Sequence, residues 1–219
     1  MNIYYTEHTQ TFHLCNQEIS YIMTVLPNRQ MGQLYFGKRI HHRENFTYLL
    51  ETGYRPMASY VFEGDSSFSL EHIRQEYGVY GSTDYRRPAV SLLQANGSRL
   101  SDFQYLDHEI TDGKPKLAGL PATYTEKDSE AKTLTLRLAD PVTGVQLQLL
   151  YTIFVQGGII ARSALLENQG EESVHLTTAM SLCLDLPDCD YEWLQFSGAW
   201  ARERHLKVRR LTQGIQAVD

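Results

Sequence analysis

The side chains that could carry chemistry include three acidic residues near the end of the chain, Asp185, Asp188 and Asp190. Hydrolysis of a glycosidic bond uses two carboxyl groups held about 5–10 Å apart, so a group of acids is a candidate for it. Pro187 interrupts this group, however, and spacing along a chain does not identify a catalytic pair. We interpret these residues as a polar loop that follows a strand.

The histidines and cysteines are not spaced as metal ligands. His41 and His42 are adjacent, and adjacent side chains of an extended segment point to opposite faces. A structural zinc site needs four ligands with close paired spacing, which this sequence lacks. A Gly-rich phosphate loop and a Gly-x-Ser-x-Gly nucleophile turn are missing from the sequence too. The residue spacing therefore indicates neither a zinc site nor a phosphate-binding loop.

Aromatic side chains are stronger candidates for binding a ligand. The chain has 14 Tyr, 8 Phe and 2 Trp. A flat ring suits the apolar face of a sugar, although Tyr and Trp also fill the cores and edges of β-sandwiches. Trp200 differs from the others because it follows two small residues, Gly198 and Ala199, and is surrounded by charge. For Trp200 we favour a binding role.

Bulk composition excludes several classes of protein. The 219 residues are 42% hydrophobic and 21% charged, which is typical of a globular protein. A net charge of −6 argues against a nucleic-acid-binding surface, so we interpret the basic residues at 202–210 as a solvated strand face. No segment is apolar enough to span a membrane, and the N-terminus does not resemble a signal peptide. Three cysteines are too few for a disulfide framework, which favours the cytoplasm.

The elements that must position these side chains are strands joined by tight turns. Hydrophobic residues alternate with polar ones over 132–138 and again over 145–149, which predicts two strands with one buried face. Gly157-Gly158 predicts a hairpin turn before a strand at 159–165, and residues 12–14 and 20–26 predict an opening hairpin. Asn96-Gly97 predicts a further hairpin that pairs 89–93 with 100–105. Residues 68–77 are the one segment spaced for a short helix.

This pattern predicts an all-β fold, an antiparallel sandwich with little helix, over a single domain at 1–219. The chain stops directly after a strand-like pattern, and an uncovered strand edge is an aggregation liability. We therefore expect the sandwich to be incomplete at its C-terminal end and more of the protein to follow.

Seven stretches, in family order from about residue 10 to the end, resemble the N-terminal domain of glycoside hydrolase family 36 α-galactosidases. They are LYFGK (34–38), QEYG (75–78), GSTDYRRPA (81–89), GLPATY (119–124), LLY (149–151), IARS (160–163) and GAWARE (198–203). The resemblance implies a galactose-mutarotase-like β-supersandwich followed by a catalytic (β/α)₈ barrel that is absent from this chain. It also implies retaining hydrolysis of terminal α-galactosyl residues, as in melibiose and raffinose, without a metal or cofactor.

The resemblance places substrate contacts, but no catalytic residue, in this chain. In the family the nucleophile and the acid/base are aspartates of the barrel, so neither can be assigned here. Trp200 resembles the tryptophan that lines the galactose subsite. A second family contact is an acidic residue in the loop after the Tyr-Phe-Gly strand, where this sequence places Glu51, Gly53 or Tyr54 within 50–56. That departure leaves the second contact open.

The resemblance also implies partners, and two other interpretations stay open. Bacterial family members often form tetramers in which the sandwich meets a neighbour's barrel, so we expect contacts with the chain's own barrel and with other subunits. A free-standing carbohydrate-binding module is the main alternative. A mutarotase-like enzyme is the third, but its paired His and Glu are not provided by His108-Glu109, which are adjacent and point apart in a strand.

Overall fold

The structure is a computed structural model that describes residues 1–54, 57, 59–81, 83–119 and 122–218. The chain forms two compact units, Met1–Asp185 and Leu186–Asp219. Some residues singled out from the sequence lie outside the described ranges: Arg55 and Pro56 of the 50–56 loop, and Ser82, Leu120 and Pro121 of the family-like stretches.

The first unit opens with a four-stranded antiparallel sheet. Its strands follow one another in chain order, β1 (Asn2–Thr6), β2 (Thr11–Cys15), β3 (Ile19–Val25) and β4 (Met31–Lys38). The predicted opening hairpin is confirmed, because β2 pairs with β3 from Thr11 opposite Thr24 to Cys15 opposite Ser20.

A second four-stranded antiparallel sheet contains the alternating segments. Its strands are β6 (Gln104–Asp112), β7 (Ala131–Ala139), β8 (Val145–Phe154) and β9 (Ile160–Asn168), again in chain order. The Asp140 carboxylate accepts hydrogen bonds from the backbone N–H groups of Val142 and Thr143 and so closes the β7–β8 turn. Gly157, at φ +79°, lies in the predicted turn between β8 and β9.

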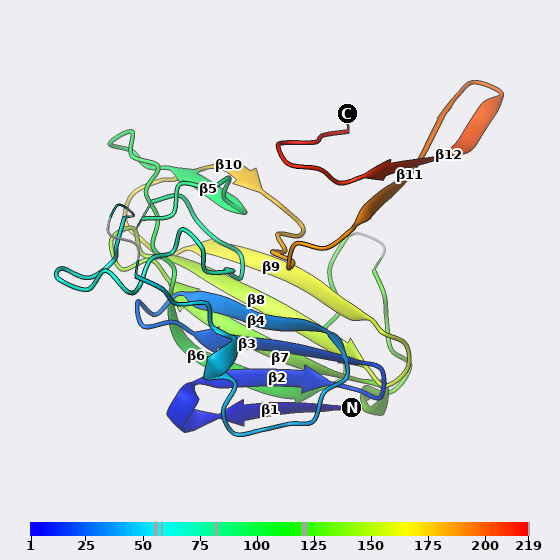
Figure 1. The fold of residues 1–219 in the computed structure, drawn as a ribbon, viewed down its shortest axis with the longest axis horizontal. Helices are drawn as coiled ribbons and strands as arrows, with labels where there is room; N and C mark the ends of the chain where they lie inside the picture. The colour runs from blue at the N-terminus through cyan, green and yellow to red at the C-terminus, as the bar shows by residue number, and fades with distance from the viewer. Residues whose placement is uncertain (55–56, 58, 82, 120–121, 219) are drawn as a thin grey trace. The chain divides into compact units, whose positions relative to one another are not determined.

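The main core of the first unit lies between the two sheets, which Figure 1 shows stacked face to face. The leucines of β7 and β8 point inward because side chains alternate along a strand. They meet apolar side chains of β2 and β3, and the central members of the core are Phe12, Leu14, Tyr21, Met23, Leu134, Leu136, Leu147, Leu149 and Tyr151. Burial of each such side chain stabilises the fold by about 1.5–3 kcal/mol. The expected all-β antiparallel sandwich is confirmed.

Helical structure among the described residues is limited to three short 3₁₀ turns, η1 (Glu7–Thr9), η2 (Thr47–Leu49) and η3 (Asp128–Glu130). The prediction of a short helix at 68–77 is wrong. Its apolar residues Leu70 and Ile73 are buried as expected, but the backbone bonds to β4 instead. Gln33 N–H donates to the Arg74 carbonyl and Glu76 N–H donates to the Met31 carbonyl, both at 2.9 Å.

The predicted hairpin at Asn96-Gly97 is also wrong in its pairing. The turn forms, with Gly97 at φ +83° and its N–H bonded to the Gln94 carbonyl. Strand β5 (Val90–Leu93) nevertheless pairs with β10 (His175–Ala179), a strand that lies far along the sequence. Residues 100–103 form no strand, and Gln104 begins β6.

The second unit is an antiparallel hairpin of β11 (Glu192–Ala199) and β12 (Arg202–Arg210). Every residue of β12 is exposed, so the interpretation of its basic side chains as a solvated strand face is confirmed. One face of the hairpin is apolar and also exposed, because cross-strand pairs place together Leu194, Phe196, Leu206 and Val208. We call these four residues the apolar face.

Candidate functional site

Trp200 lies in the tight connection between β11 and β12, and its neighbours explain the Gly-Ala-Trp-Ala-Arg-Glu sequence. A Cβ atom at Gly198 would lie 2.6 Å from the Arg202 carbonyl oxygen and 2.8 Å from Glu203 Cα, so only glycine fits. Ala201 adopts the left-handed conformation at φ +57°, and its N–H donates to the Glu203 carboxylate at 3.1 Å. These contacts fix the turn on which Trp200 sits.

The side chain of Trp200 is 96% exposed. Tryptophan can also fill the core of a β-sandwich, but a residue with this exposure is not part of a core formed by the described residues. An exposed indole offers an apolar face of large area and a single N–H donor, which suits the carbon-bound face of a sugar and one of its hydroxyl groups. The ring of Trp200 is therefore accessible to a ligand.

Glu51, Gly53 and Tyr54 lie together in an exposed loop of the first unit, directly after η2. Tyr54 is 72% exposed. Gly53 has no positive φ, and a Cβ atom there would meet nothing within 4 Å, so its backbone does not require glycine. The loop can present a carboxylate and a phenol to a ligand. These three residues belong to the first unit, whereas Trp200 belongs to the second.

The chain leading to this loop is anchored on the outer face of the first sheet. Phe46 is 1% exposed and packs with Ile22 and Leu34. His13, which is fully buried on β2, reaches His42 through their Nδ1 atoms at 3.2 Å, and its Nε2 lies 2.9 Å from Ser20 Oγ. Burial lowers the pKa of His13 to about 4, and the charges of His42 and Arg39 add to this effect. His42 therefore contacts a buried residue of the sheet, His13, and helps to hold this segment in place.

A buried charged network lies between the two sheets, and sequence reasoning did not single it out. The Glu76 side chain is fully buried, and its carboxylate accepts hydrogen bonds from the hydroxyls of Tyr21 (β3) and Tyr151 (β8). Arg162 of β9 donates to the same carboxylate at 2.8 Å. Burial raises the pKa of Glu76, while the Arg162 charge and the two hydroxyl donors oppose that rise. Glu76 lies in the QEYG stretch and Arg162 in the IARS stretch, but neither sequence indicates that these side chains are buried.

The acidic residues near the end of the chain have separate partners. Asp185 accepts a hydrogen bond from the Gln75 N–H at 3.2 Å and one from the Arg86 guanidinium at 3.3 Å. Asp190, in the second unit, pairs with Arg210. These contacts agree with the interpretation of the acids as polar loop residues.

His108 and Glu109 point to different partners, as expected for neighbours in a strand. The His108 ring bonds the Tyr105 hydroxyl at 2.8 Å, whereas Glu109 pairs with Arg137 at 3.3 Å. They do not form the facing His–Glu pair that a mutarotase-like reaction would need.

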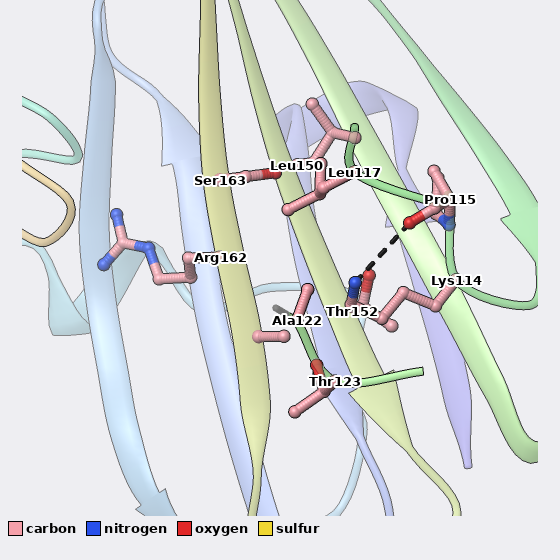
Figure 2. Close-up of a pocket in the computed structure, with 10 residues that line it drawn as sticks. Lys114, Pro115, Leu117, Ala122, Thr123, Leu150, Thr152, Arg162 and Ser163 are labelled. Atoms are coloured by element: carbon pink, nitrogen blue, oxygen red, sulfur yellow. Dashed lines mark hydrogen bonds between the residues drawn. The ribbon is translucent and has the colours of Figure 1, made fainter. Parts of the chain in front are cut away.

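A cavity of about 260 Å³ lies on the outer face of β8 and β9, under the segment that holds Lys114 and Leu117. Figure 2 shows Leu150 and Ser163 at its floor, while the Arg162 side chain points away from it. The lining is mostly apolar with a few hydroxyl groups, and it includes none of Trp200, Tyr54, Glu51 or Gly53. Its two charged lining residues are Lys114 and Arg162, and because the Arg162 side chain points away, the described lining does not bring two charged groups together.

The described residues contain neither a metal-binding cluster nor a membrane-spanning helix. Among them, no group of three or more His, Cys, Asp or Glu side chains could hold a metal ion. The same residues include no helix that is long and apolar enough to cross a membrane.

Comparison with known proteins identifies the family of the chain. The model of the glycosyl hydrolase family 36 N-terminal domain matches residues 29–219. The chain belongs to this family. A curated relative, α-galactosidase AgaA of Geobacillus stearothermophilus, is 38% identical over 100% of this chain and 30% of its own length.

Solved structures of family 36 enzymes share the fold. The crystal structure of an α-galactosidase from Lactobacillus brevis matches 98% of this chain and 29% of its own, at 39% identity and a TM-score of 0.93. A variant of the Geobacillus AgaA in complex with raffinose matches 94% of this chain and 29% of its own, at 38% identity and a TM-score of 0.88. The chain thus spans about 30% of the length of these α-galactosidases.

Proposed function

We propose that the complete protein containing this domain is an α-galactosidase that releases terminal non-reducing α-D-galactosyl residues with retention of configuration. The observation that carries the proposal is membership of family 36 over residues 29–219. A relative at 38% identity is an α-galactosidase, and AgaA structures hold raffinose and stachyose. The substrates proposed here are accordingly galactosides of the melibiose and raffinose type.

Within that enzyme, the role of this domain is to shape the galactose subsite. Trp200 supports this role because its ring is exposed on a turn that Gly198 and Glu203 constrain, so it is presented at little cost in conformational entropy. The 50–54 loop supplies a second set of candidates in Glu51, Gly53 and Tyr54. The groups that break the glycosidic bond belong to a barrel outside this chain.

The same domain takes part in contacts with the barrel and with neighbouring subunits, up to a tetramer. The apolar face of the hairpin supports such contacts, since Leu194 and Phe196 are 62% and 72% exposed. A two-stranded hairpin is only marginally stable in water, and clustered exposed apolar residues mark surfaces that other polypeptide covers. The cytoplasm is the proposed compartment, because all three cysteines are free thiols.

The proposal is tested by giving the complete protein raffinose and following the products by NMR. We expect galactose to appear first as the α-anomer, because a retaining enzyme preserves the configuration of the substrate. First appearance of the β-anomer would exclude retention, and no release by a folded protein would exclude the activity itself.

The alternative function is a free-standing carbohydrate-binding module, and the exposed ring of Trp200 is the observation that favours it. Calorimetry of residues 1–219 with galactose and with melibiose separates the two functions. If the subsite needs the barrel, titration to millimolar sugar gives no binding heat. Millimolar or tighter binding would support the module instead.

A further inference from the structure

Three of the seven family-like stretches meet at the cavity on the outer face of β8 and β9. The stretches LLY, IARS and GLPATY line it with Leu150, Ala161, Ser163, Ala122 and Thr123. These segments lie far apart in the sequence, and none of the five side chains belongs to the core between the two sheets. The cavity therefore brings together outward-facing residues that the packing of the core does not explain.

The floor of the cavity consists of two cross-strand pairs. Leu150 of β8 lies opposite Ser163 of β9, and Thr152 lies opposite Ala161. All four residues line the cavity, whereas Arg162, between two of them on β9, points away from it (Figure 2). Because a continuous antiparallel ladder holds these side chains, little conformational freedom is lost when a ligand binds over them.

Lys114 enters the lining from a fixed point of the backbone. The preceding residue, Gly113, donates its N–H to the Ala131 carbonyl at 2.8 Å and accepts from the Thr133 hydroxyl at 2.7 Å. Gly113 has a φ of +82°, which favours glycine. Among the described residues the Lys114 ammonium bonds the Pro115 carbonyl, at 3.5 Å. Two of its three N–H groups are therefore available to a ligand.

We propose that this cavity binds a short aliphatic carboxylate. The Lys114 ammonium pairs with the carboxylate, the hydroxyls of Ser163 and Thr123 donate to it, and the aliphatic chain packs against Leu117 and Leu150. A charge-assisted hydrogen bond is about twice as strong as a neutral one, so the charged end sets the orientation. The cavity measures about 260 Å³ and its described lining includes no aromatic side chain, which suits a ligand of few carbons better than a sugar ring. Binding of a carboxylate here is independent of the galactosidase activity proposed above.

Saturation-transfer difference NMR of the complete protein with sodium butyrate tests this site. We expect transfer from the protein to the butyrate methyl group and a Kd of about 1–10 mM, since a ligand of so few atoms binds weakly. 1-Butanol has a similar apolar chain and no charge, so it should bind at least about fivefold more weakly. Equal affinity for the two ligands would overturn the carboxylate class, and no transfer to butyrate would overturn the site.

Two variants and a matched control locate the binding at this cavity. Lys114→Gln should raise the Kd for butyrate at least about fivefold, whereas the control Lys116→Gln, at an exposed residue outside the described lining, should change it less than about twofold. Ser163→Leu should abolish the transfer because its larger side chain fills the cavity, and the space there lets circular dichroism stay native. Equal effects of the two lysine changes, or unchanged binding in a folded Ser163→Leu protein, would overturn the proposal.

Discussion

At the scale of single residues, the first unit depends on a carboxylate that sequence reasoning could not find. Glu76 is surrounded by Tyr21, Tyr151 and Arg162, which come from three different strands and meet only in the folded chain. A buried charge is tolerated when donors surround it, and it becomes costly when one partner is removed. Its sequence neighbours Gln75 and Tyr77 give no sign of this role.

Replacing Glu76 with Gln should lower the free energy of unfolding by about 3–5 kcal/mol, because Arg162 is then left buried without a charged partner. Urea unfolding of the 219-residue chain measures the change. The matched control is Glu109→Gln, whose carboxylate is 57% exposed beside Arg137 and should cost within about 0.5 kcal/mol. Equal losses of unfolding free energy at the two positions would contradict the conclusion that Glu76 stabilises the fold through its buried contacts.

His13 makes stability depend on pH. Its pKa is about 4 in the folded chain and about 6.5 when unfolded, so the unfolded state takes up a proton first as the pH falls. The stability that neutral His13 contributes is present above about pH 6.5 and is lost as the pH falls towards 4. The loss amounts to about 2–3 kcal/mol at pH 4.5.

Urea unfolding at pH 7 and pH 4.5 checks this expectation in the wild type and in His13→Gln. The variant should lack this part of the pH dependence. The same dependence in both chains would show that other groups cause it.

At the scale of elements, the alternating strand pattern correctly predicted the sandwich, whereas two predictions from local motifs were wrong because these segments bond to distant strands. Alternation over 132–138 and 145–149 identified β7 and β8 because one face of each strand is buried. The 68–77 segment has helical spacing, yet it forms turns and bends, and its backbone bonds to β4 at Arg74 and Glu76. Asn96-Gly97 does form a turn, but β5 takes β10 as its partner, and a local motif carries no information about a strand more than 80 residues away.

The hairpin turn makes a prediction at the same scale. Gly198→Ala places a Cβ atom 2.6 Å from the Arg202 carbonyl oxygen, so we expect it to destabilise the hairpin by about 1–3 kcal/mol. The indole N–H signals of the two tryptophans, both in this unit, report the change by NMR. Gly53→Ala is the control, because nothing lies within 4 Å of its added methyl group. An unaltered hairpin in Gly198→Ala would contradict the steric role of Gly198.

At the scale of the whole molecule, the fold class was predictable from the sequence and the organisation of the candidate site was only partly so. The exposure of Trp200 follows from small neighbours and surrounding charge, which are visible in the sequence. The division of the chain at Asp185 was not predicted, because it depends on where the contacts of Gln75 and Arg86 stop. The chain also spans only about 30% of the length of its relatives.

The central claim, that this domain completes the galactose subsite of an α-galactosidase, is tested most directly by kinetics of Trp200→Ala in the complete enzyme. Loss of the exposed ring should lower kcat/KM for raffinose at least tenfold, which corresponds to a loss of about 1.4 kcal/mol or more in transition-state binding. Circular dichroism and the urea midpoint should stay unchanged, since the side chain is 96% exposed. Wild-type kinetics in a well-folded Trp200→Ala enzyme would contradict the claim and remove Trp200 from the subsite.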